Sequence, residues 1–271
     1  MKNKLNNVVV FNFSKIYEDE DFLDDVKNPR FIDVSDISGT RGICDDIAIS
    51  EIKKRISVIQ DETNENISNG VHFIDNGNYH YMTKILTDYI DEPFQLVYFD
   101  HHPDLKASIF GDILSCGSWV RNAQIENPNI RKISAIGIDS SLWKKIPIED
   151  REHIAYIKDF DTDTLSKDAQ KYITRIVETL DTELPIYISI DKDVLDKKEI
   201  QTNWDQGTMT LNRMLMIIKH LKENFRVIGV DICGEMEQRD SFDALETEQK
   251  RNIEANKKIL QIFFEKDVDI S

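Results

Sequence analysis

The sequence has few cysteines and no long apolar run. Cys44, Cys116 and Cys233 are widely spaced and form no Cys-x-x-Cys pair, which excludes a disulfide scaffold and a structural zinc site of the usual spacing. No apolar stretch reaches the ~20 residues that a transmembrane helix needs, and the first apolar run is too short for a signal peptide. We therefore expect a cytoplasmic protein that does not associate with membranes.

Basic residues are also scarce. The 271 residues contain 34 Lys and Arg against 50 Asp and Glu, a net charge of −16. This balance argues against binding nucleic-acid phosphates or an anionic membrane surface. An acidic surface is compatible with a cationic substrate, although solubility alone accounts for most of it.

Apolar runs typical of buried parallel strands alternate with longer helical patterns. The predicted strands are 8–13, 31–34, 94–99, 133–138, 186–190 and 227–230, with weaker candidates at 72–74 and 154–157. The predicted helices are 46–59, 79–91, 164–181, 210–223 and 244–264, the third with an N-cap supplied from 163–168. This alternation predicts an α/β fold of three layers, α/β/α, with a mostly parallel sheet. Because no repeat or linker divides the chain, we expect one domain over 1–271.

One acidic cluster follows the predicted strand 94–99. Asp100, His102 and Asp104 are spaced by two residues, so they point to one side if the extended conformation continues, with His101 on the other. Such residues at the carboxyl ends of parallel strands are where active sites collect. Two carboxylates and an imidazole converging without a cation would be unfavourable, and mixed O/N ligands suit manganese, iron, zinc or nickel better than calcium.

A second cluster ends the strand 186–190. Asp191 and Asp193 flank Lys192, which should face away from them, and His80 lies in a turn ahead of a helix. Either cluster alone is as readily structural, because Asp at a strand end is a common turn former or N-cap. Together they provide four carboxylates and two histidines, which match a site where two metal ions ~3.5 Å apart share a water and lower its pKa.

Three segments in this order resemble motifs of the ureohydrolases, the arginase and agmatinase superfamily. They are Gly77-Asn-Tyr-His80, Asp100-His-His102-Pro-Asp104 and Ser189-Ile-Asp191-Lys-Asp193-Val-Leu-Asp196. The resemblance spans roughly residues 70–235 and implies an arginase-like metallohydrolase with two Mn²⁺ ions, iron, nickel and cobalt being alternatives. It assigns the metal ligands to His80, Asp100, His102, Asp104, Asp191 and Asp193. The reaction implied is hydrolysis of a guanidino group to an amine and urea, with Asp104 passing a proton to the leaving amine.

The sequence departs from the pattern of this family at four positions. Cys116 stands where the family has a proton-shuttling histidine, and we expect it to act as a substitute, a packing residue or a wall of the substrate site. Lys106 replaces the asparagine that helps arginases hold the carboxylate of free arginine. His101 replaces a small residue and is expected to pack behind the strand.

The fourth departure concerns recognition of the guanidinium. The late strand of the family ends Asp-x-x-Glu, whereas here Asp231 is followed by glutamate one position later, at Glu235. Glu235 is therefore the first candidate for a catalytic contact with the guanidinium, and Glu237 the second. Trp119 and Trp204 are candidates for the mouth of the substrate site.

The substrate is the least determined part of this reading. The missing contacts for free arginine, and the segments Asp-His-His-Pro-Asp and Ser-Cys-Gly-Ser-Trp, resemble the peptide arginases, which convert arginine residues of peptides to ornithine. We favour peptidyl arginine, with free arginine, agmatine or another small guanidino compound as alternatives. A zinc deacetylase of the same fold is disfavoured because its histidine pair lies in a separate loop. A metal-binding scaffold without activity stays open, as does a homo-oligomer built through the C-terminal helix.

Overall fold

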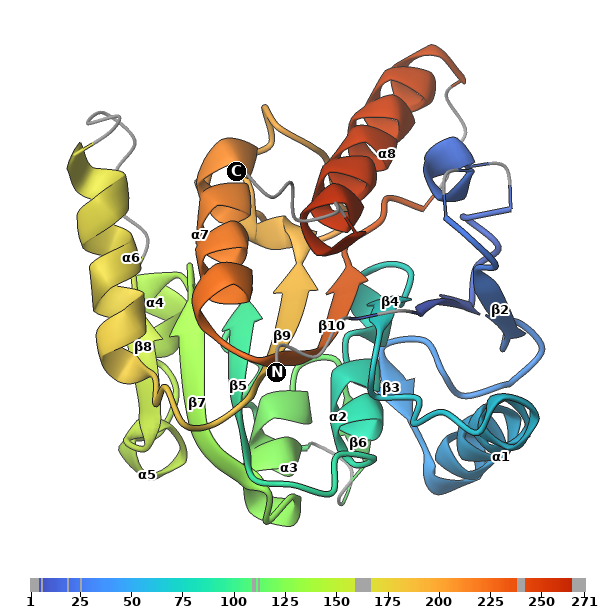
Figure 1. Cartoon of the computed structure of the whole chain (residues 1–271), viewed down its shortest axis with the longest axis horizontal. Coiled ribbons are helices and arrows are strands. Elements are labelled where there is room, and N and C mark those ends of the chain that lie inside the picture. Colours follow the sequence, from blue (N-terminus) through green and yellow to red (C-terminus); the bar gives the residue numbers. More distant parts are fainter. Residues whose placement is uncertain are drawn as a thin grey trace, which may run out of the picture.

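The computed structural model describes residues 5, 7–18, 20–24, 26–108, 111, 113–158, 167–237 and 242–264, with side chains from 170 and 247 onward in the last two ranges. Eight strands form one sheet in the order β2-β1-β4-β10-β9-β5-β7-β8, and every pair of neighbours is parallel. Figure 1 shows the sheet running across the molecule. The strands are β1 (Val8–Asn12), β2 (Arg30–Asp33), β4 (Val71–Phe73), β5 (Phe94–Phe99), β7 (Ile130–Ile136), β8 (Ile154–Ile157), β9 (Ile186–Asp191) and β10 (Val227–Cys233). A separate antiparallel pair joins β3 (Ile43–Cys44) to β6 (Leu114–Ser115).

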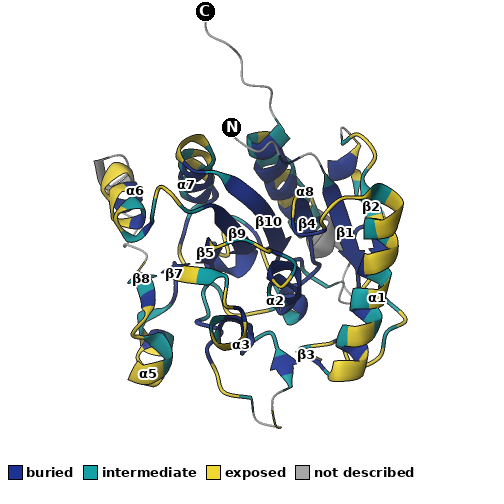
Figure 2. Ribbon diagram, turned by 60° about the horizontal axis from the view of Figure 1, so that its bottom comes forward, coloured by how far each residue is buried: buried dark blue, intermediate teal, exposed yellow. Residues whose placement is uncertain are grey.

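Helices cover both faces of the sheet. One apolar cluster packs α6 (Lys167–Thr179), α7 (Leu211–Asn224) and α8 (Phe242–Phe264) on one face. A second packs α1 (Asp46–Thr63), α2 (Met82–Thr87) and α3 (Trp119–Glu126) on the other. Figure 2 shows β1, β4, β9 and β10 buried between helices whose outer sides are exposed. The predicted α/β/α layers with a parallel sheet are therefore confirmed.

The predicted strands agree with the observed ones within a few residues, because continuous apolar runs can be buried only between two layers of helices. The predicted helices beginning near 46 and 210 are confirmed, and the structure shows an N-cap at each. Asp45 accepts from the Ala48 amide at 2.8 Å, and Thr210 accepts from the Arg213 amide at 3.3 Å. The residues proposed to cap the third helix lie partly outside the described residues.

The chain departs from the prediction in its short elements. The predicted helix 79–91 is instead a 3₁₀ turn, η2 (Gly77–Tyr79), followed by the short helix α2. The sequence pattern did not indicate α3, α4 (Ser140–Trp143), α5 (Ile148–Arg151), η1 (Asp21–Leu23) or η3 (Lys192–Val194). These elements span at most eight residues, too few for a helical period to stand out. No helix in the described ranges is long and apolar enough to cross a membrane.

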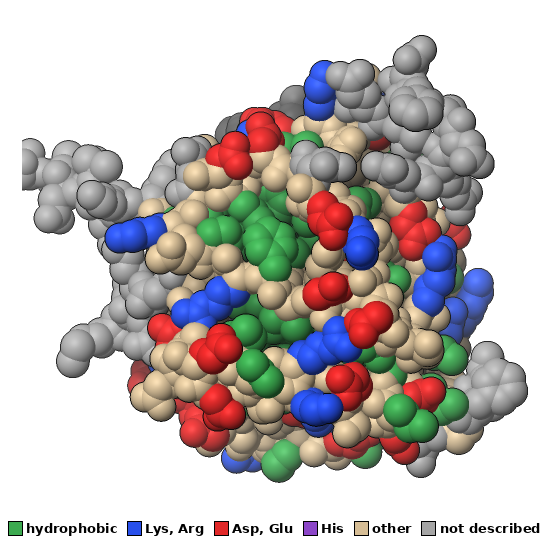
Figure 3. All heavy atoms as spheres, turned by 90° about the vertical axis from the view of Figure 1, so that its right-hand side faces the viewer, with side chains coloured by type: hydrophobic (Ala, Val, Ile, Leu, Met, Phe, Trp, Pro, Cys, Tyr) green, Lys and Arg blue, Asp and Glu red, His purple; other side chains and the backbone are tan. Residues whose placement is uncertain are grey.

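Charge is dispersed on the face seen from the right-hand side of Figure 1. Acidic and basic side chains alternate there, with small apolar patches between them (Figure 3). Ion pairs such as Arg55 with Asp36, at 2.6 Å, belong to this pattern. The net negative charge of the chain is therefore not gathered into one acidic surface on this side.

Candidate metal centre

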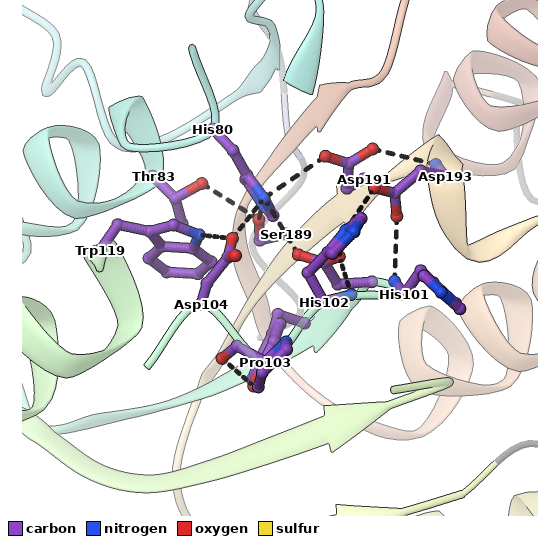
Figure 4. A network of polar contacts seen from close by, with 12 residues as sticks. His80, Thr83, His101, His102, Pro103, Asp104, Trp119, Ser189, Asp191 and Asp193 are labelled. Atoms are coloured by element: carbon purple, nitrogen blue, oxygen red, sulfur yellow. Dashed lines mark hydrogen bonds and ion pairs between the residues drawn. The ribbon is translucent and has the colours of Figure 1, made fainter. Parts of the chain in front are cut away.

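Four adjacent strands bring the predicted ligands together. The order β4-β10-β9-β5 places the carboxyl ends of these strands side by side. Asp100 follows β5, Asp191 ends β9, Asp193 lies in η3, and His80 follows η2 after β4. Figure 4 shows His80, Asp191 and Asp193 converging although their segments are far apart in sequence. All four side chains are buried.

His80 faces three carboxylates. Its Nδ1 lies 3.2 Å from Asp100 Oδ2, 3.2 Å from Asp104 Oδ2 and 3.6 Å from Asp191 Oδ2. Both His80 Nδ1 and Asp100 Oδ2 are buried and find no hydrogen-bond partner among the described residues. Unpaired polar atoms are costly in a protein interior. A cation bound between His80 Nδ1 and Asp100 Oδ2 would provide both atoms with a partner.

A second group of ligand atoms lies on the other side of Asp100. His102 Nδ1 is 2.8 Å from Asp193 Oδ2 and 3.5 Å from Asp100 Oδ1. Asp100 thus offers one carboxylate oxygen to each group, and the ligand atoms within each group lie within 4.8 Å of one another. One carboxylate shared by two clusters is the arrangement needed to bridge two metal ions.

The electrostatics of these carboxylates also fit cations. Burial, followed by the charges of Asp193 and Asp100, raises the pKa of Asp191 to about 7. Burial and then the charge of Asp100 raise the pKa of Asp193 to about 6. Acids held this close repel one another unless a positive charge lies among them. Oxygen and imidazole ligands suit manganese and its neighbours among the divalent transition metals.

Cys233 is an additional group near this centre. It lies within reach of His80 and Asp191 as a third possible ligand set, but burial raises the pKa of its thiol well above the ordinary value. Because the thiolate is the form that binds metals, the two carboxylate sets are the better ligands.

A layer of hydrogen bonds behind the ligands orients them. His80 Nε2 lies 2.9 Å from Ser189 Oγ, which in turn donates to Asp231 Oδ1 at 2.8 Å. Thr83 Oγ1 donates to the same oxygen at 3.0 Å. This chain fixes the ring of His80 with Nδ1 toward the carboxylates, the role that outer partners have at metal sites. Ser189 and Asp231 belong to the sequence motifs, but motif spacing does not indicate this orienting role.

Asp104 reaches the site by a different backbone path from the one predicted. The extended conformation does not continue past β5, and Asp104 has a φ of 49°, in the left-handed region, which is uncommon for a residue with a side chain. Trp119 Nε1 donates to Asp104 Oδ2 at 2.7 Å and holds it toward His80. Lys192 does face away from its flanking aspartates, as predicted.

A cavity of about 410 Å³ opens above these ligands. Cys116 and Lys106 lie on its wall, and burial followed by the charge of Asp104 raises the pKa of the Cys116 thiol to about 12. His101 lies beside this region, its ring 5.1 Å from that of His102. The complete lining is Gly42, Gly77, Asp100, His102, Pro103, Asp104, Lys106, Ser115, Cys116, Gly117, Leu142, Lys145, Ile146, Asp191, Asp193 and Trp204.

Two residues predicted to contact substrate lie elsewhere. Trp119 is fully buried under Asp104 and does not line the cavity. Glu235 is buried as well, and it binds Lys192 Nζ and Asn256 instead of facing the cavity. In both cases the side chain satisfies a buried polar partner, and neither side chain faces the cavity in this structure.

The comparisons with known proteins agree with this geometry. The Arginase family model matches residues 11–243. The chain belongs to the arginase family. It is 26% identical over 261 residues to an uncharacterized protein of Thermotoga maritima, which covers 96% of this chain and 91% of that protein. This family comprises hydrolases of carbon–nitrogen bonds in linear amidines.

Solved structures show the same fold at low identity. Arginase from Bacillus caldovelox aligns with a TM-score of 0.67 at 12% identity, covering 98% of this chain and all of that one. Proclavaminate amidino hydrolase from Streptomyces clavuligerus aligns with a TM-score of 0.68 at 15% identity, covering 97% and 94%. The arginase fold is thus preserved, while substrate recognition must be argued from the residues of this chain.

Proposed function

We propose that this arginase-family protein hydrolyses a guanidino group to an amine and urea, using two divalent cations, with Mn²⁺ as the first candidate. The observation that carries the proposal is the pair of ligand groups that share Asp100, one with His80 and Asp104 and the other with His102 and Asp193. Asp191 faces the first group through its Oδ2. The six residues lie at one edge of the sheet beneath a cavity that can admit a substrate.

Each residue has a defined task in this proposal. When bound, the two cations supply the acidity that activates a water near neutral pH. Asp104 lines the cavity, and because Trp119 binds its Oδ2, its Oδ1 is the oxygen proposed to accept a proton and return it to the leaving amine. Ser189 keeps His80 Nδ1 turned toward the ligands.

We favour an arginine residue within a peptide as the substrate, over free arginine, agmatine or another small guanidino compound. Lys106 occupies the position where arginases have an asparagine for the free amino acid, and it is an exposed residue on the cavity wall. Pro103, Leu142 and Ile146 give the cavity apolar surface on which a longer ligand can lie.

One observation favours a second candidate, a metal-binding protein without hydrolytic activity. Cys116 is the cavity residue in place of the family's shuttle histidine, and its thiol, with a pKa raised to about 12 by burial and by Asp104, is a poor proton carrier at neutral pH. Both candidates require metal in the two ligand groups, because unpaired buried carboxylates are costly to keep, so urea release and not metal content separates them.

Urea release by the manganese-loaded protein tests both candidates. Free arginine, agmatine and a peptide with an internal arginine are offered in parallel, with ornithine formation in the peptide measured by mass. Urea from the peptide alone supports a peptide arginase. Urea from a small molecule supports the hydrolase proposal but replaces peptidyl arginine as the proposed substrate. No urea from a protein with two metals bound refutes the hydrolase proposal.

A further inference from the structure

The carboxylate expected at the end of β10 is missing from the cavity. Gly234 occupies the position of the family's glutamate, with a φ of 94°, and a Cβ there would lie 2.7 Å from Asp191 Oδ1 and 2.8 Å from the Lys192 amide nitrogen. No side chain can therefore replace it. Glu235, one residue later, is bound to Lys192 and Asn256. A guanidinium in this cavity needs another partner.

Trp204 lies on a loop that is fixed to the metal centre. The amide of Gly207 donates to the carbonyl of Asp193 at 2.7 Å. At the other end of the loop, Asn203 Oδ1 accepts from the amide of Glu237 at 2.7 Å. These bonds tie the loop on both sides of Trp204 to the segments that follow β9 and β10, so the loop is anchored to the same strands that position the ligands.

The indole of Trp204 lies directly beside the ligands. A Cβ built on Gly77 would be 2.9 Å from Trp204 Cδ1 and 3.0 Å from Asp191 Oδ2, which places the indole and this carboxylate on the same side of Gly77. The rings of Trp204 and His102 are 5.8 Å apart and cross at 72°. Trp204 lines the cavity, and it keeps 39% of its surface exposed.

We propose that Trp204 binds the guanidinium of the substrate through the face of its indole and so replaces the family's glutamate. This inference rests on the proposed hydrolysis of a guanidino group. Guanidinium is planar and weakly hydrated, and it stacks on aromatic faces, tryptophan giving the strongest cation–π contact. An indole attracts the cation without adding a carboxylate that would compete for the metal ions. The contact is worth an affinity gain of about 3- to 30-fold.

The test compares a cation with its neutral isostere. Dye-labelled blocked peptides, one with arginine and one with citrulline, are mixed with the manganese-loaded full chain, and binding is read from fluorescence anisotropy before turnover. The variants are Trp204→Leu and Trp204→Phe. Trp143→Phe is the matched control, because Trp143 is buried against Tyr156, with ring centroids 4.6 Å apart, and does not line the cavity.

We expect Trp204→Leu to weaken binding of the arginine peptide about 10-fold and to change citrulline binding less than about 2-fold, with metal content unaltered. Trp204→Phe should bind the arginine peptide with an affinity between those of the unmodified protein and Trp204→Leu. It also provides the test if Trp204→Leu does not fold. Equal losses for both peptides, or no loss, would overturn the inference by making Trp204 an apolar wall or a bystander. A selective loss in a protein that releases no urea would support the inference and refute only the hydrolase proposal.

Discussion

Lys192 and Glu235 form an ion pair that is completely enclosed in the protein between the metal centre and α8. Asn256 on α8 completes the unit, accepting from Lys192 Nζ at 3.0 Å and donating to Glu235 Oε1 at 2.8 Å. Since Lys192 lies between Asp191 and Asp193, the pair holds the turn that aims both aspartates at the site. Glu235 is consequently a positioning residue in this structure.

Breaking this pair should unfold the protein more readily. Glu235→Gln or Lys192→Met leaves one buried charge without its partner and is expected to cost about 3–5 kcal/mol of unfolding free energy, whereas the double variant should recover most of it. Glu92→Gln, which breaks the partly exposed pair with Arg226, is the control and should cost less than about 1 kcal/mol. Denaturant unfolding gives the values. An unchanged stability with a raised KM in Glu235→Gln would instead restore a substrate contact.

Metal binding should depend on Asp100 more than on any other carboxylate, because Asp100 belongs to both ligand groups. Asp100→Ala is expected to lose both ions, and Asp193→Ala to lose at least one, with activity lost in parallel. Asp196→Asn is the control, since the Asp196 carboxylate accepts from the amide of Lys198 in a turn, at 2.8 Å, and belongs to neither ligand group. Mass spectrometry measures the number of metal ions bound by each variant. An Asp100→Ala protein with both ions bound would contradict the proposed centre.

Ser189→Ala should weaken metal binding without removing a ligand. The substitution frees the ring of His80 and leaves Asp231 with one fewer donor, and loss of such an outer partner typically costs about 10- to 100-fold in metal affinity. Ser134→Ala on β7 is the matched control, because the hydroxyl of this buried serine forms a hydrogen bond with Thr179 Oγ1, at 2.9 Å, and with no metal ligand among the described residues. Competition with a chelator measures both variants, and equal affinities would show that Ser189 does not orient His80.

Cys116 is expected to be dispensable. Its half-buried, protonated thiol forms part of the cavity wall, so Cys116→Ser should retain most of the activity. The measurement is kcat and KM for urea release. Complete loss of kcat with normal metal content would make the thiol a participant in proton transfer.

Glu20 should make stability depend on pH away from the metal centre. Burial, followed by the charge of Glu235, raises the pKa of Glu20 to about 9. The folded state then holds a proton that the unfolded state releases above ~4.5, so stability falls as pH rises from about 4.5 to about 9. Glu20→Gln should flatten this decline and raise the melting temperature at pH 8 by several degrees. Equal melting curves for both proteins across that range would contradict the assignment.

The sequence was most informative where one pattern has one physical solution. Continuous apolar runs such as 94–99 and 186–190 can be only buried strands between helices, and acids directly after them must lie at the carboxyl edge of a parallel sheet. His80, Asp100, His102, Asp104, Asp191 and Asp193 are therefore brought together as predicted, although their assignment as metal ligands stays a prediction.

Contacts between distant segments could not be read in this way. Trp119 and Asp104 are fifteen residues apart, and their bond exists because α3 packs under the loop after β5. Glu235 followed the expected motif by one residue, and that shift turns its side chain from the cavity to Lys192 and α8. One residue of displacement at a strand end reverses the side to which a side chain points. The spacing of residues in the sequence does not predict which partner the side chain then contacts.

The sequence by itself determined the layered α/β/α architecture and the acidic edge, because both follow from local periodicity and from the cost of burying unpaired carboxylates. Only the tertiary structure decided that Ser189 orients His80 and that Trp204 rather than Glu235 borders the cavity. Those relationships depend on how strands and loops far apart in the chain pack together, which local sequence does not encode.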